Sequence, residues 1–389
     1  MSPQTLDRHT IFLAVTGSHA YGTARPQSDI DVRGCCVAPP ALRLSFYRAF
    51  EQHQHQDGPP PAGPSWDAAM TALRGHPTAG ALARASAQPE LDLVIYDLSK
   101  LVSLCAEANP NMLELLFIDD REVLLARPAW ERLRAHRQLF LTRKAKFTYA
   151  GYAQSQLRRI KGHRAWLLNP PTREPLRADF GLPESTVLSA DDRNRINEAV
   201  SKTIRDWGVE DMELGGAERD VLRERMRDFW ATTLRCADAT RLDDQVYTLA
   251  AASLGLTKDV LQALKQERGY RAARKQWEQF QRWQRERNPA RAALEARHGY
   301  DTKHGMHLIR LMRTGLEIVR DGALAVRRDD AEELAAIRDG ALSYDELLAE
   351  AERLQALLDA AERTSALPRA PDREAIDTLL RELLLESMR

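Results

Sequence analysis

Two aspartates near the amino terminus, Asp29 and Asp31, have the spacing of a metal-binding pair. They lie in an alternating Asp-Ile-Asp-Val pattern, and alternate side chains of a β-strand point to the same face of a sheet. Two carboxylates side by side repel each other unless a positive charge lies between them, and hard divalent cations with oxygen ligands are the usual solution. A Gly-Ser pair, Gly17-Ser18, precedes them and follows the apolar run 11–15. We therefore expect this stretch to hold a metal-bound triphosphate.

The elements that must position these residues are strands in the first third of the chain. The patterns predict strands at 11–16, 29–37 and 91–97, with a turn and a short helix after Gly17. From Ser99 the pattern becomes helical. We expect an α+β protein, with a mixed sheet and flanking helices in domain 1–125 and an all-helical domain in 126–389 that closes a cleft. A flexible insertion is expected at about 51–88, and the longest helices at 143–168, 191–214, 217–240, 258–287, 304–320, 344–364 and 372–388.

Composition limits the classes of protein. The 389 residues are 43% hydrophobic, which suffices for a sizeable core and two domains. The 56 basic and 56 acidic residues cancel, so any basic binding surface must be local. The four cysteines lack CxxC spacing, which is typical of reduced thiols in a cytosolic protein. No signal pattern and no run of about 18 apolar residues is present, so we expect a cytoplasmic protein with no membrane partner.

The whole motif resembles the DNA polymerase β-type nucleotidyltransferase superfamily, in which Gly-Ser, ten residues and an Asp-x-Asp flanked by apolar residues follow one another. The chain also resembles the RNA repair pathway DNA polymerase β family, a predicted bacterial and phage nucleotidyltransferase family. The phrases that carry this second resemblance are GSHAYGT, SDIDVRG, NPNMLELLF, GYAQSQLRRIKGHR, LRADFGLPE, GYDTKHGMHLIRL and ALPRAPD. It extends over nearly the whole chain except 51 to about 90. It implies a polymerase β-like amino-terminal domain that transfers nucleotides, with RNA ends as acceptors.

The resemblance implies a third acid on a neighbouring strand. Asp92 is the candidate because it opens an apolar, β-rich run. Asp97 falls on the opposite face of that strand and Glu90 precedes it, so both are weaker alternatives; a solvated acid at a strand end is the interpretation without a metal. In the two-metal mechanism of such enzymes, Asp29, Asp31 and Asp92 bind two Mg²⁺ ions, with Mn²⁺ as the alternative metal.

The nucleotide, ATP or another NTP, needs groups that hold its phosphates. Gly17 lets the backbone approach closely, and Ser18 with the backbone N–H groups that follow it would hold phosphate oxygens. His19 either contacts phosphate or packs locally. Arg33, which shares a strand face with Asp31, either contacts phosphate or balances the acids.

Further cations come from the helical half. Lys303, His307 and Arg310 stand at i, i+4 and i+7, on one helix face. A solvated surface face is the alternative interpretation of such a stripe. We expect Lys303 to reach the nucleotide phosphates across the cleft, with His307 and Arg310 as lesser candidates.

Basic and aromatic residues are interleaved along 143–166, in a pattern that either tracks a nucleic-acid backbone or forms an amphipathic helix. The candidates there for binding the acceptor are Tyr152, Gln156 and Arg159. Together these features predict a metal-dependent nucleotidyltransferase that moves an NMP from an NTP to a hydroxyl acceptor, an RNA 3′ end, and releases pyrophosphate. Two alternatives stay open: an adenylyltransferase acting on a small molecule or a protein side chain, and a non-catalytic nucleotide-binding regulator.

Overall fold

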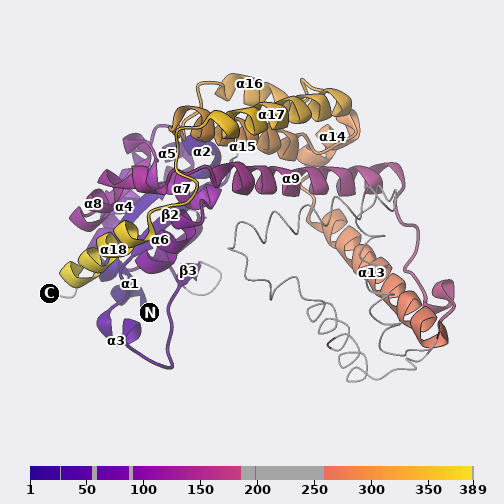
Figure 1. Cartoon of the computed structure of the whole chain (residues 1–389), viewed down its shortest axis with the longest axis horizontal. Coiled ribbons are helices and arrows are strands. Elements are labelled where there is room, and N and C mark those ends of the chain that lie inside the picture. Colours follow the sequence, from indigo (N-terminus) through magenta and orange to yellow (C-terminus); the bar gives the residue numbers. More distant parts are fainter. Residues whose placement is uncertain (27, 55–58, 87–90, 185–197, 199–257, 388–389) are drawn as a thin grey trace. The chain divides into compact units, whose positions relative to one another are not determined.

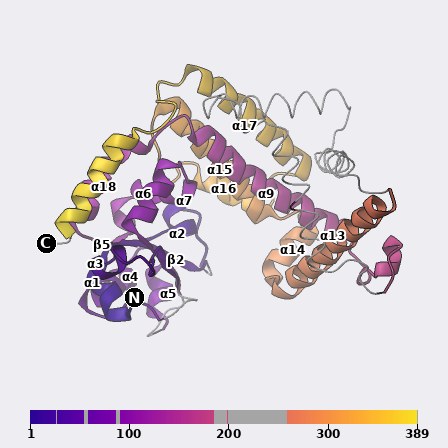
Figure 2. The ribbon, with the colours of Figure 1, turned by 60° about the horizontal axis from the view of Figure 1, so that its bottom comes forward.

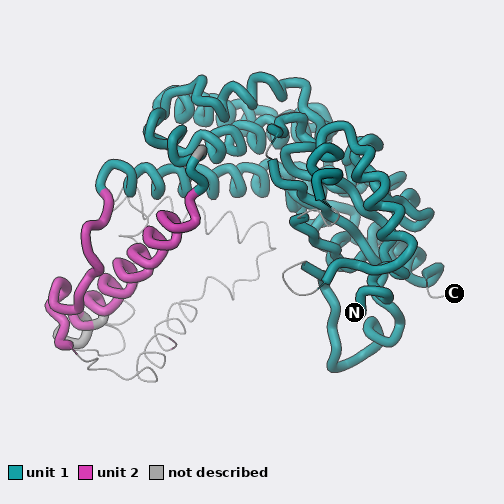
Figure 3. Tube along the Cα trace, turned by 180° about the vertical axis from the view of Figure 1, so that it is seen from behind, with its two compact units in different colours: residues 1–169, 288–389 teal, residues 170–287 magenta. Residues whose placement is uncertain are grey.

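The computed structural model describes residues 1–26, 28–54, 59–86, 91–184, 198 and 258–387. The chain divides into two compact units, residues 1–169 with 288–389 and residues 170–287 (Figure 3). The first unit thus continues past residue 125, where the composition changes, and takes in helices that follow the second unit in sequence. The predicted helices at 191–214 and 217–240 lie outside the described residues. None of the described helices is both long and apolar enough to cross a bilayer.

A mixed five-stranded sheet forms the amino-terminal part of the first unit, in the order β3-β4-β2-β1-β5. The central strands β1 and β2 are antiparallel, whereas β2 and β4 are parallel. The three predicted strands are confirmed. β5 and β3 were not predicted, and β3 lies in a stretch expected to be a mobile loop. The strands are β1 (Thr10–Val15), β2 (Ile30–Cys36), β3 (Gln52–Gln54), β4 (Leu91–Asp97) and β5 (Val123–Ala126).

The sheet is buried on both faces, which explains why β1 is a continuous apolar run. Leu13 and Val15 join a smaller core with Leu73; the helices on this side are α1 (Pro3–His9), α4 (Pro64–Arg74) and α5 (Gly80–Arg84). Within the insertion expected at 51–88, residues 64–84 form α4 and α5, which bury apolar side chains against the sheet. Phe12 and Ala14 face the larger core, where the Phe12 ring stacks on Trp130 at 3.8 Å.

Helices cover the second face of the sheet and confirm the α+β class (Figures 1 and 2). Within this layer α15 packs against α9, α16 and α17. Short helices α2 (Gly17–Tyr21) and α3 (Pro40–Arg43) connect the strands. The longer ones in this unit are α6 (Leu98–Ala106), α7 (Pro110–Leu116), α8 (Pro128–Ala135), α9 (Ala145–Leu168), α14 (Pro289–His298), α15 (Thr302–Asp321), α16 (Ala331–Arg338), α17 (Tyr344–Thr364) and α18 (Arg373–Ser387). The second unit contains α13 (Lys258–Glu286) and a 3₁₀ turn, Arg177–Phe180.

The start of α15 is set by a side-chain cap. The Asp301 carboxylate accepts a hydrogen bond from the backbone N–H of His304 at 3.1 Å, which satisfies one of the free donors at a helix start. The helix therefore begins at Thr302, two residues before the predicted bound.

The contact between α9 and α15 allows a test of packing. A Cβ atom at Gly315 would lie 2.8 Å from Tyr149 Cβ, whereas a Cβ at Gly162 would have nothing within 4 Å. Gly315→Ala should lower the free energy of unfolding by about 1–3 kcal/mol through overpacking. Gly162→Ala should raise it by up to about 1 kcal/mol through helix propensity. Urea denaturation of both variants measures the difference, and equal midpoints would contradict this packing.

Candidate active site

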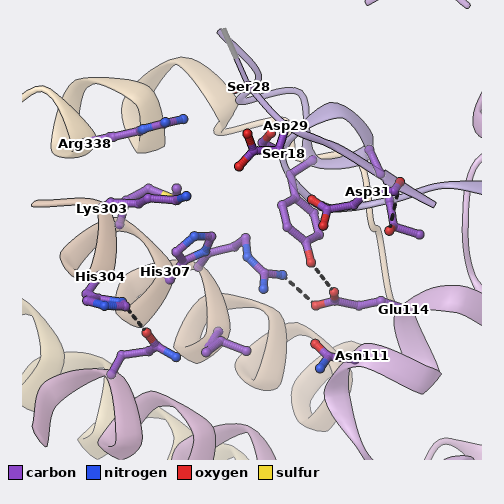
Figure 4. A pocket seen from close by; sticks show the side chains of 18 of the residues that line it. Ser18, Ser28, Asp29, Asp31, Asn111, Glu114, Lys303, His304, His307 and Arg338 are labelled. Carbon is purple, nitrogen blue, oxygen red and sulfur yellow. Dashed lines mark hydrogen bonds and ion pairs between the residues drawn. The ribbon is translucent and has the colours of Figure 1, made fainter. Parts of the chain in front are cut away.

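A pocket of about 790 Å³ lies within the first unit, between β2, β4 and the helices α7, α9, α14 and α15. It gathers residues from both ends of the chain, and Figure 4 shows acids on one side and cations on the other. Among the predicted site residues, the ones that line it are Gly17, Ser18, Asp29, Asp31, Arg33, Tyr152, Gln156, Arg159, Lys303, His307 and Arg310. His19 and Asp92 do not line it.

Asp31 lies against the backbone of Gly17. Gly17 has φ +65°, and a Cβ atom there would lie 2.2 Å from Asp31 Oδ2. Only glycine meets both conditions, the left-handed backbone and the close approach of the carboxylate. Burial raises the pKa of Asp31 despite the nearby Arg33 guanidinium, and the carboxylate of Asp92 adds to this rise. The carboxylates of Asp31 and Asp92 are therefore close enough to repel each other.

Asp92 is the direct partner of Asp31 in the register of the parallel strands β2 and β4. Its side chain is 60% exposed, at the rim of the site. Arg33 Nη2 lies 2.9 Å from Asp92 Oδ2 and 3.5 Å from Asp31 Oδ1, a geometry that fits its predicted charge-balancing role. The alternative Asp97 is buried, caps α6 and pairs with Arg43 at 2.6 Å. The other alternative, at position 90, lies outside the described residues.

His19 does not line the pocket, so the structure favours local packing over the predicted phosphate contact. Its side chain is buried, and its Nδ1 lies 2.9 Å from Thr78 Oγ1. The neighbouring His76 forms a buried pair with Glu122, with 2.9 Å between Nε2 and Oε2. This part of the chain thus attaches α2 to the α4–α5 segment.

A cationic wall faces the acids. In Figure 4 the side chains of Lys303 and Arg338 extend toward the side that carries Asp29. Burial lowers the pKa of Lys303, and the charges of Arg291 and Arg338 lower it further. Burial also holds the pKa of His307 well below its usual value, so this imidazole is neutral near pH 7. Arg338 was not predicted, because only the packing of α16 against α15 brings it to the pocket.

Lys303 and His307 line the pocket and can donate hydrogen bonds to a ligand, the first as a cation and the second as a neutral group. Among the described residues, neither side chain has an ion-pair or hydrogen-bond partner. Arg338 has only a long contact, 3.4 Å from its Nη1 to the carbonyl oxygen of Thr23. These side chains can therefore bind an anion without first losing an ion pair.

Arg310 differs from Lys303, because its charge is already engaged. Its Nη1 lies 2.6 Å from Glu114 Oε1, and its guanidinium lies 3.8 Å from the centre of the Tyr21 ring. The Tyr21 hydroxyl donates to Glu114 Oε2 at 2.6 Å. All three side chains are buried. We call this set the Glu114 node; it joins α2, α7 and α15 in the wall of the pocket.

The predicted acceptor-binding residues lie along one side of α9. The Tyr152 hydroxyl accepts a hydrogen bond from Asn109 at 2.8 Å, and Gln156 Oε1 lies 2.7 Å from His304 Nδ1. Arg159 lines the same wall. Two of these three polar groups are thus held in place by the protein itself.

Comparison with known proteins agrees with this architecture. Residues 3–166 match the model of the RNA repair pathway DNA polymerase beta family. This part of the chain is similar to that family. The RNA repair pathway DNA polymerase beta family match includes all three predicted acids and ends in α9, so the helices that supply Lys303 and Arg338 lie beyond it. No curated protein and no solved structure matches the chain.

The Glu114 node predicts a stability effect in this chain. Glu114→Gln keeps the shape but leaves the Arg310 charge buried without a counter-charge, which should cost about 3–5 kcal/mol. Asp321→Asn removes the partner of an exposed pair with Arg320 and should cost less than about 1 kcal/mol. Denaturation followed by tryptophan fluorescence compares them. Similar midpoints for the two variants would show that the Glu114 node does not make this contribution to stability.

Proposed function

We propose that this chain is a metal-dependent nucleotidyltransferase that moves an NMP from an NTP to the 3′ hydroxyl of an RNA and releases pyrophosphate. One observation supports this most strongly: acids from adjacent strands, Asp29 and Asp31 with Asp92 at the rim, face Lys303 and Arg338 across a single pocket. The description of the matched family, which names DNA polymerase beta and an RNA repair pathway, also supports it.

The donor set of the three acids fits Mg²⁺ or Mn²⁺. Carboxylate oxygens are the ligands that these hard cations take in proteins. The backbone register holds Asp31 and Asp92 side by side. Burial raises the pKa of Asp31, and the Asp92 carboxylate adds to this rise. A bound pair of metal ions supplies charge stabilisation to the attacking and leaving oxygens of an in-line displacement.

The side chains of this chain bind and orient the reactants. Ser18, Lys303 and Arg338 hold the triphosphate, and His307 donates a neutral hydrogen bond. The acceptor hydroxyl forms a bond to the α-phosphorus, the bond from the α-phosphorus to the bridging oxygen breaks, and pyrophosphate leaves. Asp92, exposed beside Asp31, is placed to take the proton of the hydroxyl. Positioning and charge neutralisation dominate such transfers.

The first test follows labelled nucleotide into product. Wild-type protein with Mg²⁺, each α-labelled NTP and an RNA with a free 3′ hydroxyl should give labelled RNA and pyrophosphate. Asp31→Asn should lower the rate at least about 100-fold, or about 2.7 kcal/mol of transition-state stabilisation. Asp67→Asn, on the exposed side of α4, is the matched control and should keep full activity.

The same experiment separates the alternatives. Blocking the RNA 3′ end should abolish labelling of RNA. Label that appears instead on a small molecule or on protein would favour the adenylyltransferase alternative. Nucleotide that binds without release of pyrophosphate would favour the non-catalytic regulator.

The cationic wall predicts a change in nucleotide affinity. Lys303→Met and Arg338→Met each remove a charge that contacts phosphate in this proposal, and each should raise the KM for NTP about 10–100-fold, as expected for a charge-assisted contact. Arg363→Met, at an exposed position of α17, serves as the control. Initial rates against NTP concentration give the KM values; unchanged values in both pocket variants would remove these residues from the phosphate site.

A further inference from the structure

A second group of metal-ligating side chains lies at the edge of the pocket, away from the three acids. It consists of His163 on α9, Asp301 at the cap of α15 and His304 in the first turn of α15. One donor atom from each lies within 4.8 Å of the others. Asp301 is fully buried and His304 also lines the pocket. We call this set the His-Asp-His triad.

The spacing within the triad is close to that of the ligands of one metal ion. Asp301 Oδ2 lies 3.5 Å from His163 Nδ1 and 3.6 Å from His304 Nε2. Hydrogen bonds between nitrogen and oxygen are shorter, about 2.7–3.2 Å. Ligand atoms around a tetrahedral Zn²⁺, with bonds of about 2.0–2.1 Å, lie about 3.3 Å apart. Both distances to Asp301 Oδ2 lie within a few tenths of an ångström of this spacing.

The orientation of His304 supports the same conclusion. Its Nδ1 lies 2.7 Å from Gln156 Oε1, and an amide oxygen only accepts hydrogen bonds, so Nδ1 carries the proton. Nε2 is then unprotonated and lies 3.6 Å from Asp301 Oδ2, so both atoms can serve as ligands of one cation. A polar group that fixes the remote nitrogen of a ligating histidine is a common feature of metal sites.

Arg291 of α14 is the group that opposes a metal ion here. Its Nη2 forms an ion pair with the same Asp301 Oδ2, and its Nε lies 3.5 Å from the buried Glu295 carboxylate. The guanidinium therefore shares the carboxylate that an ion would bind. Removing this charge should strengthen metal binding, provided that the triad is a metal site.

We propose that the His-Asp-His triad binds a transition-metal dication, Zn²⁺ in the first place. Two imidazoles and one carboxylate leave a fourth position for water or a ligand, as in catalytic zinc sites. Imidazole donors favour Zn²⁺ and Co²⁺, whereas the all-carboxylate set of Asp29, Asp31 and Asp92 favours Mg²⁺. The two sites therefore differ in their metal, and this inference does not depend on nucleotidyl transfer.

Metal binding by the full-length chain tests the proposal. Protein freed of metal by a chelator is dialysed against Zn²⁺ in the presence of excess Mg²⁺, and bound metal is measured by mass spectrometry. Co²⁺ titration followed by visible absorption reports ligand geometry. The protein should bind one equivalent of Zn²⁺ in the first experiment and one equivalent of Co²⁺ in the second. His304→Ala and His163→Ala should each weaken binding of both metals at least about 10-fold. His136→Ala, at an exposed histidine of the same unit, should leave it unchanged.

A gain-of-affinity variant guards against a loss that arises from poor folding. Arg291→Met should tighten Zn²⁺ and Co²⁺ binding, while Asp31→Asn should leave both unchanged. Wild-type protein that binds no stoichiometric metal would overturn the proposal. So would a Co²⁺ spectrum that is the same in His304→Ala as in wild type, or an affinity that Arg291→Met does not raise.

Discussion

The buried pair between Arg310 and Glu114, completed by Tyr21, is the interaction on which the site depends. It connects the short helix after the Gly-Ser turn to the long helix α15, across α7. A buried charge is tolerated only when it is paired and hydrogen-bonded. The node therefore sets the distance between the strand that carries the acids and the helix that carries Lys303.

The two walls of the pocket carry opposite charges, and on each wall like charges repel one another. The pKa of Asp31 is raised and that of Lys303 is lowered, in both cases first by burial and then by like charges nearby. Folding thus holds acids together on one wall and cations together on the other. A ligand that carries both dications and polyphosphate would relieve both kinds of repulsion, which is why the proposed nucleotide fits the site.

Local patterns were sufficient to predict the central strands and most helices of the described part. Hydrophobic runs and alternation identified β1, β2 and β4, and helical spacing identified α9 and α17. The edge strands β3 and β5 were missed because they are short and their stability comes from pairing with neighbours. The insertion at 51–88 was expected to be flexible because of the Gln, His, Gly and Pro content at its start, whereas its α4–α5 part buries apolar residues against the sheet.

The sequence by itself determined the Asp29–Asp31 pair, the Gly17 turn and the strand that begins near Asp92, because strand alternation and glycine geometry are local properties. Tertiary structure alone decided which distant groups meet these acids. In the folded chain His19 is buried against Thr78, Arg310 forms an ion pair with Glu114, and Arg338 lines the pocket. The physical reason is that contacts between residues far apart in the chain depend on how helices pack, and no spacing along the sequence encodes that.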